Sequence, residues 1–184
     1  ITPLNNLSEL VLGKLKINLN TEGFADLCTD LIIESELELT EGSIHLNKNR
    51  ISIQNNTEQG IKKGNGFIVC NEKEGSIIRS NNLLINYEFP FGTNDGKYVP
   101  VFINCKSGTG KTIKVNSIST NKENLPLPAG LSANLLNSGN AISDQIDRWW
   151  QIDANGITGD ITLTYASEEN STIESKRQEN FSIK

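Results

Sequence analysis

The sequence predicts an all-β protein, with short β-helix-like or meander strands in residues 1–87 and an antiparallel β-sandwich-like part in residues 88–184. Asn, Ser, Thr, Gly and Ile are abundant, whereas windows rich in Ala and Leu are scarce. β-Branched residues favour the pleated surface of a sheet, and Gly and Asn favour turns. Short apolar segments recur between such turns along most of the chain. One continuous core shared by both parts is the alternative to two separate units.

Length and charge limit the classes of function. The 184 residues carry 17 Lys and Arg against 22 Asp and Glu, a net charge of −5. Because nucleic acids and anionic membranes attract basic patches, we expect neither as a partner. No apolar run approaches the roughly 20 residues of a membrane-spanning helix, so we expect no transmembrane segment. The sequence starts at Ile1 without a signal peptide, and we expect a mature or trimmed fragment.

The first half of the chain shows the pattern of a β-helix. Residues 10–19 alternate in part and are typical of one or two strands, while residues 23–30 fit either a helical turn or a loop. Three apolar-x-apolar triplets follow at a regular spacing: Leu37–Leu39, Ile44–Leu46 and Ile51–Ile53. Their apolar residues lie two positions apart, unlike those of a coiled coil. We favour three strands that close one β-helix coil, with corners at Gly42 and Asn47/Asn49, over a meander.

Short strands are expected to continue beyond these triplets. The sequence predicts them at Ile61 and at residues 67–69, 75–78 and 83–85, with turns at 64–66 and 80–82. A further turn at 92–96 precedes a β-branched and aromatic strand at 98–103. Pro90 and Pro100 lack an N–H and are expected at strand starts or sheet edges. His45, between two inward apolar residues, is expected to point outward into solvent.

The segment Cys105–Thr112 resembles a phosphate-binding loop but lacks its first glycine. That motif reads G-x4-G-K-[ST], and Cys occupies the first position here. Both flanks predict strands, whereas a phosphate-binding loop opens a helix. We therefore interpret this segment as a β-hairpin turn.

The three cysteines allow at most one internal disulfide. Cys70 and Cys105 each end an apolar strand and form the candidate pair. The alternative is that these two and Cys28 are unpaired, buried thiols. A zinc site that combines the cysteines with His45 is not expected, because no C-x2-C spacing exists.

Both tryptophans lie in one segment, 147–153. It follows a long connection, 121–140, in which one helical turn is expected at 133–136. In an extended strand, Trp150 and Ile152 share one face and Trp149 lies on the other. Trp150 would then anchor the core, and Trp149 would stack on a sugar ring or fill an interface, unless a neighbouring loop covers it. We name Trp149, Asp147 and Asp153 as candidate binding residues.

The C-terminal stretch predicts one clear strand and a polar tail. Residues 161–165 alternate, which places Ile161, Leu163 and Tyr165 on the inward face. Residues 167–176 are polar and charged, and a last short strand is expected at 181–183.

The order of these motifs resembles repeat modules in large secreted and cell-surface, adhesin-like proteins of Bacteroidetes, many of them exported by the type IX secretion system. It runs from the apolar triplets to Gly64–Val69, Gly75–Arg79, Phe89–Gly92, Tyr98–Val101, Asp147–Trp150 and Ile161–Tyr165. The resemblance implies an extracellular location. It also implies structural roles in core and corners for seven residues: Phe89, Pro90, Gly92, Tyr98, Pro100, Arg148 and Trp150. The cysteines are not part of this pattern.

These observations lead us to expect a non-enzymatic structural or adhesive module of a larger surface protein or fibre. Its partners would be other copies or other segments of the same protein, joined at strand edges such as residues 10–19 or 181–183. The alternative is a carbohydrate-binding module that uses Trp149, or a glycan-active enzyme that uses nearby carboxylates, namely Asp144, Asp147, Asp153 and Asp160. We expect no cofactor. Calcium at the turn 94–96 or at Asp153 and Asp160 is the alternative, although no stretch matches a calcium-binding loop.

Overall fold

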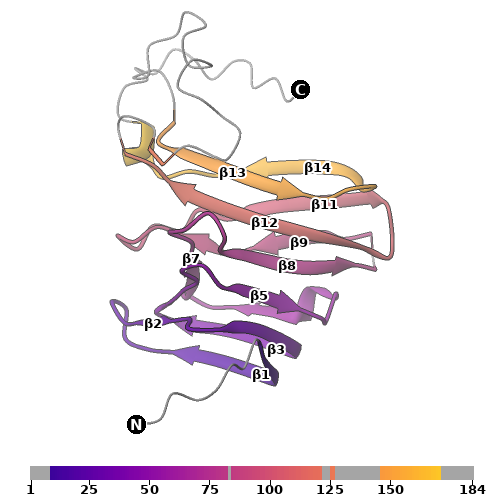
Figure 1. Ribbon diagram of the computed structural model, residues 1–184, viewed down its shortest axis with the longest axis horizontal. Helices are drawn as coiled ribbons and strands as arrows, with labels where there is room; N and C mark the ends of the chain where they lie inside the picture. Colours follow the sequence, from indigo (N-terminus) through magenta and orange to yellow (C-terminus); the bar gives the residue numbers. More distant parts are fainter. Residues whose placement is uncertain (1–8, 83, 122–124, 127–145, 171–184) are drawn as a thin grey trace, which may run out of the picture.

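The computed structural model describes residues 9–82, 84–121, 125–126 and 146–170, and these residues form an all-β fold. Its strands are stacked as successive layers, with the first coil at one end and the last two strands at the other (Figure 1). The N-terminal part is a β-solenoid, and an antiparallel part continues it. The predicted fold class is therefore confirmed.

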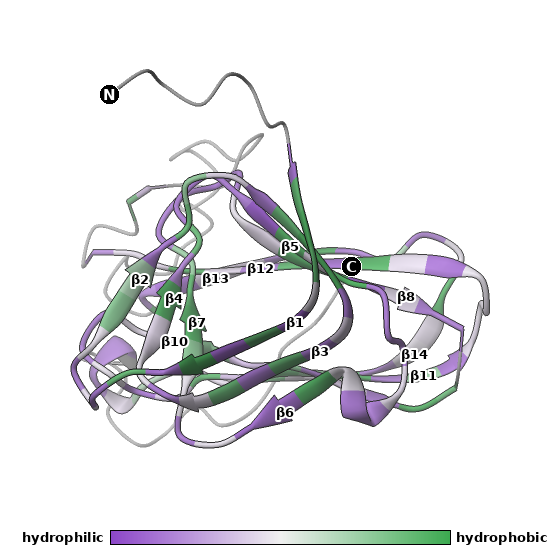
Figure 2. Ribbon diagram, turned by 90° about the horizontal axis from the view of Figure 1, so that it is seen from below, coloured by the Kyte–Doolittle hydropathy of each residue, from purple (hydrophilic) through white to green (hydrophobic). Residues whose placement is uncertain are grey.

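Parallel strands build the solenoid. In one sheet, β1 (Glu9–Asn18), β3 (Asp30–Glu41), β5 (Arg50–Ile53) and β8 (Ser76–Asn81) pair in that order, and β6 (Ile61–Lys63) pairs with the second half of β3. A separate parallel sheet contains β2 (Phe24–Asp26), β4 (Ser43–His45), β7 (Phe67–Val69) and β10 (Phe91–Gly92). Viewed along the stack, the two sets of strands form different sides of one coil (Figure 2).

The three apolar triplets form three sides of a single coil, as predicted. The first lies in β3, the second begins in β4 and the third lies in β5. Gly42 and Asn47 occupy the corners with φ angles of 81° and 51°, a left-handed conformation that Gly and Asn adopt most easily. His45 points away from the core as predicted, but Phe24 stacks on its ring with centroids 4.6 Å apart.

Each coil repeats the position of the coil before it. Leu31, Ile51 and Ile77 are register partners in three successive strands, and each is buried. Asparagine amides join neighbouring coils at the corners, between residues 20 to 23 positions apart: Asn47 to Asp26, Asn49 to Leu27, Asn55 to Ser35, and Asn71 with Asn94. The many asparagines of the sequence therefore stabilise the stacking of coils.

The chain then reverses direction. β11 (Val101–Ser107) runs antiparallel to β9 (Asn86–Phe89), and β12 (Lys111–Ser119) runs antiparallel to β8. A second reversal adds β13 (Arg148–Asp153) to β12 and β14 (Thr158–Leu163) to β11. The sequence-based boundary between residues 87 and 88 falls inside β9, and one hydrophobic cluster extends from Ile17 to Ala166.

Several details of the sequence-based assignment differ from the structure. The strand expected at 83–85 begins instead at Asn86, where it pairs with β11. Cys105–Thr112 does contain a turn between strands, but β11 and β12 belong to different sheets and do not form a hairpin. Ile161 and Tyr165, expected inside, are 40% and 39% exposed, because β14 is the outermost strand of its sheet and Tyr165 lies beyond its end.

Some expected elements lie outside the described residues: the helical turn at 133–136, the strand at 181–183 and most of the polar tail. Within the tail, Ser167–Asn170 forms the short 3-10 helix η4. A second 3-10 helix, η1 (Glu58–Gly60), precedes β6.

The corner at Gly42 gives a direct test of coil stacking. A Cβ atom there would lie 2.7 Å from the Gly23 carbonyl oxygen of the preceding coil, whereas one at Gly96, where φ is also positive, meets nothing within 4 Å. We expect Gly42→Ala to lower the free energy of unfolding by about 3 kcal/mol and Gly96→Ala by about 1 kcal/mol. Denaturant titration measures both values. Equal losses would show that backbone strain alone, and not coil contact, determines the effect.

Candidate functional site

The three candidate binding residues lie on one strand or directly before it. Trp149 and Asp153 lie on the same strand, β13, whereas Asp147 precedes the strand in a bend whose N–H donates to the Glu169 carbonyl oxygen at 2.8 Å. Trp149 is half-buried, and its Nε1 donates to the Pro126 carbonyl oxygen at 2.8 Å. The indole N–H of Trp149 is therefore already donated within the chain, and a bound sugar could not accept a hydrogen bond from it without breaking this one.

Trp150 lies on the other side of β13, as the alternation predicted. It pairs with Ser117 of β12, while Ile152 pairs with the buried Val115. Both Trp150 and Trp149 pack against the core cluster. The half-buried Trp150 keeps its Nε1 without a hydrogen-bond partner among the described residues.

A buried ion pair fixes the start of β13 to the end of the described chain. Arg148 donates from Nε and Nη2 to the two carboxylate oxygens of Glu169 at 2.8 and 2.7 Å, and from Nη1 to the Ser117 hydroxyl at 2.8 Å. Glu169 also accepts from the Ala166 N–H at 2.9 Å. Its carboxylate has enough partners to compensate the desolvation of the pair, so we assign Arg148 and Glu169 a structural role.

The resemblance to surface-protein repeat modules assigned structural roles to seven residues, and most of these residues are buried. Phe89, Pro90, Gly92, Pro100 and Arg148 are buried and Trp150 is half-buried, whereas Tyr98 is 37% exposed. The Tyr98 hydroxyl donates to Glu88, and the Lys63 ammonium lies 3.8 Å from the centre of its ring. Desolvation and the bond to Glu88 raise the pKa of Tyr98.

The outer face of the sheet β14–β11–β9 carries a polar surface that sequence reasoning missed. Cross-strand partners form two rows, Asn86–Asn104–Asp160 and Glu88–Phe102–Thr162. Around the half-buried Phe102 is an open hollow of about 430 Å³, lined by Asn86, Phe102, Asn104, Asp160 and Thr162. Alternation around Phe102 and Asn104 was visible in the sequence, but the pairing of three strands distant in sequence was not. We call these five residues the Phe102 surface.

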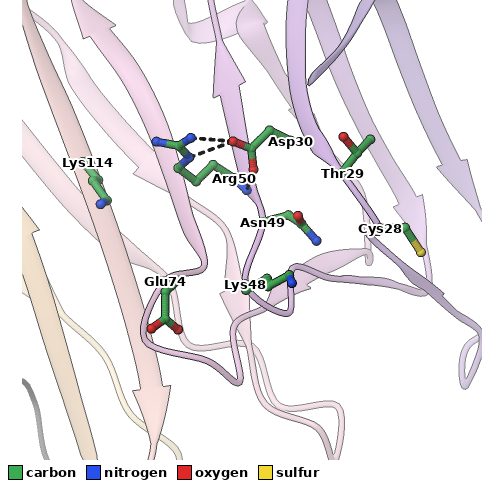
Figure 3. A pocket seen from close by; sticks show the side chains of 8 residues that line it. All are labelled: Cys28, Thr29, Asp30, Lys48, Asn49, Arg50, Glu74 and Lys114. Carbon is green, nitrogen blue, oxygen red and sulfur yellow. Dashed lines mark hydrogen bonds and ion pairs between the residues drawn. The ribbon is translucent and has the colours of Figure 1, made fainter. Parts of the chain in front are cut away.

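A second hollow, of about 550 Å³, follows a corner of the solenoid (Figure 3). Residues of successive coils line it, among them Asp30 and Arg50. The Nε and Nη2 atoms of Arg50 both donate to Oδ2 of Asp30, at 2.9 and 2.6 Å. Lys48, Glu74 and Lys114 add charges of both signs. The alternation of charges indicates a solvated corner in which adjacent coils neutralise each other.

The candidate Cys70–Cys105 disulfide is not formed. Both thiols are free and buried, Cys70 just after β7 and Cys105 within β11. The Cys70 thiol donates to the Gly75 carbonyl oxygen at 3.2 Å. Cys28 is also free but exposed, so the alternative of three buried thiols is wrong for this residue. Cys28 lines the corner hollow (Figure 3).

The described part of the chain meets neither the requirements of a metal site nor those of a membrane-spanning helix. No group of three or more His, Cys, Asp or Glu side chains lies close enough there to hold a metal ion. In the turn 94–96, Asp95 accepts a hydrogen bond from Thr93. No helix among these residues is long and apolar enough to cross a bilayer.

Comparison with known proteins gives no family for this chain. No protein-family model, curated protein or solved structure matches it.

The three thiols should differ strongly in reactivity. Burial raises the pKa of Cys70 to about 12 and also raises that of Cys105, so both remain protonated and inert near neutral pH. We expect a thiol reagent to modify one cysteine rapidly in the native protein and all three after denaturation. The Cys28→Ser variant should lose the rapid phase. Two rapid phases, or a rapid phase that survives in Cys28→Ser, would contradict the assignment.

Proposed function

We propose that this protein is a non-enzymatic, extracellular structural or adhesive module of a cell-surface protein or fibre. The observation that carries this proposal is the long open edge of the solenoid at β1. This ten-residue strand pairs with β3 on one side, and among the described residues no strand pairs with its other side. An open edge of this length presents a row of backbone N–H and C=O groups that can add another strand.

The exposed side chains at this end also support assembly. Leu10, Val11 and Phe24 are 40%, 51% and 58% exposed, and all three belong to the first coil. Apolar residues gathered at the end of a stack are typical of a surface that another module covers. The resemblance to surface proteins exported by the type IX system supports an extracellular location.

The location can be tested on intact cells that produce the protein. We expect antibodies against the folded chain to label unbroken cells, and external protease to remove that label while a cytoplasmic protein stays intact. Deletion of the coding sequence should reduce attachment of the cells to surfaces or to each other. A chain protected from protease until the cells are lysed would contradict the proposal.

Carbohydrate binding is the second candidate function. The Phe102 surface is better suited to bind a sugar than Trp149 is. An aromatic ring flanked by amides and a carboxylate offers a stacking face for a sugar and both donors and acceptors for its hydroxyl groups. Tyr98 lies near this surface, since it bonds to Glu88, the cross-strand neighbour of Phe102. Trp149, by contrast, already donates its N–H within the chain.

A glycan array with two matched variants separates the two aromatic positions. We expect Phe102→Ala to weaken binding of any oligosaccharide ligand at least tenfold, and Trp149→Ala to leave it within about twofold. Circular dichroism confirms that both variants fold. Loss of binding in Trp149→Ala alone would return the site to the tryptophan, and absence of any glycan ligand would remove this second candidate.

A further inference from the structure

The two ends of the stack have matching strand directions. β13 is antiparallel to β12, which is antiparallel to β8, so β13 runs in the same direction as the parallel strands from β1 to β8. By the same reasoning β14 runs parallel to β9. In Figure 2, β13 lies on the side of β5, and β14 lies on the side of β6 and the second half of β3. The last layer therefore follows the path that β1 follows at the other end.

The inward-facing residues of both terminal layers are incompletely covered. Leu10 is 40% exposed, although its partner Leu31 in the next layer is only 5% exposed. At the opposite end Ile161 is 40% exposed, whereas its partner Ile103 is 2% exposed. Ile152 and Leu163 are half-buried for the same reason. These side chains have the orientation of core residues, and no further layer of described residues covers them. The addition of one layer would remove their apolar area from water.

The charges of the two ends are complementary. On the outer face, Lys16, Glu38 and Lys62 form a ladder of alternating sign through three layers, with Nζ–Oε1 distances of 3.0 and 3.5 Å. Lys14 and Lys16 belong to the outermost layer at the β1 end, with side chains 70% and 55% exposed. Asp160 belongs to the outermost layer at the β14 end. Its side chain is 65% exposed and pairs with Lys106 of the layer before it, with an Nζ–Oδ2 distance of 2.6 Å, so a lysine on its other side would continue the alternation of charges.

We propose that copies of this chain stack head to tail, with β13 and β14 of one copy pairing in parallel with β1 of the next. The row Leu31–Ile51–Ile77 continues through Val115 to Ile152. Continuation of that row places Ile152 beside Leu10 of the next copy, and Asp160 on the side that carries Lys14 and Lys16. Such a contact is heterologous and does not close, so it produces linear filaments. This proposal rests on the proposed structural function and adds the partner and the geometry.

The same charges disfavour the competing geometry. Two β1 edges that met across a two-fold axis would bring the lysines of both copies together, and like charges across an interface oppose association. Edge lysines commonly protect strands from unwanted pairing. Here the lysines of β1 leave pairing with the edge that carries Asp160 favourable, which selects the head-to-tail contact.

Disulfide trapping tests the predicted neighbours. In a Cys28→Ser background, one preparation carries Leu10→Cys and another carries Ile152→Cys. We expect mild oxidation to give a covalent dimer in the mixture but in neither preparation alone, and the chain with both substitutions to give a ladder of oligomers. Lys48→Cys, at an exposed corner in the middle of the stack, is the matched control in place of Leu10→Cys. Dimers of Leu10→Cys alone, or a mixture no more cross-linked than the control, would overturn the proposal.

Charge reversal gives an independent measurement on the uncross-linked protein. We expect the sedimentation mass of the unmodified chain to rise with concentration, and Asp160→Lys or Lys16→Glu each to weaken association about fivefold. A chain with both substitutions should recover it, because the two charges are exchanged. A constant monomer mass, or three variants with equal association, would overturn head-to-tail stacking. If the protein were still found on intact cells, only the stacking would be rejected and the proposed location would stand.

Discussion

The register between successive coils is the constraint on which the rest of this structure depends. Leu31, Ile51 and Ile77 lie at one position along the stack, and a shift of one residue would turn every inward side chain outward. Backbone hydrogen bonds between layers require close approach at the corners as well, and the Ser43 N–H donates to the Gly23 carbonyl oxygen at 2.9 Å. A side chain at Gly42 would occupy that space. The corner glycines, the bridging asparagine amides and the outer charge ladder are thus consequences of one repeated geometry.

At β11 and β12 the strand pairing changes from parallel to antiparallel, but the hydrophobic core of the solenoid continues through both strands. The two strands add an antiparallel layer to two different sheets, and Val101, Ile103, Ile113 and Val115 extend the same hydrophobic cluster. Polar groups buried in this region need local partners. Arg79 donates from Nη2 to the Thr57 carbonyl oxygen at 2.8 Å, and burial lowers its pKa to about 10. The pair of Arg148 and Glu169 then fixes β13 to the residues that follow β14. These contacts link segments that are far apart in the sequence.

Local signals explain which parts of the fold could be predicted. The alternation in Ile51–Ile53 and the corner at Gly42 each involve only a few neighbouring residues, so the sequence is enough to predict short strands that close a coil. The two faces of β13 also follow from alternation alone. The absence of pairing between β11 and β12 could not be predicted, because a turn with two glycines is compatible with a hairpin and with a change of sheet. For the same reason the Phe102 surface was missed, since its rows combine residues from β9, β11 and β14. Trp149 was selected because of its residue type, but its environment depends on a hydrogen bond to Pro126, 23 positions away.

The apolar and charged residues at the two ends follow the same pattern as those between layers inside the stack. Within the solenoid, each layer stabilises the next through a shared strand direction, a shared inward row and charges of alternating sign. β1 retains all three properties on its open side, since Leu10 faces inward and Lys14 and Lys16 face outward. β14 presents Ile161 and Asp160 in the corresponding roles. An isolated stack must leave these groups partly in water at both ends, at a cost that grows with the exposed apolar area. Contact between the last layer of one copy and the first layer of another removes this cost at both ends, with the geometry that already joins the coils within the chain.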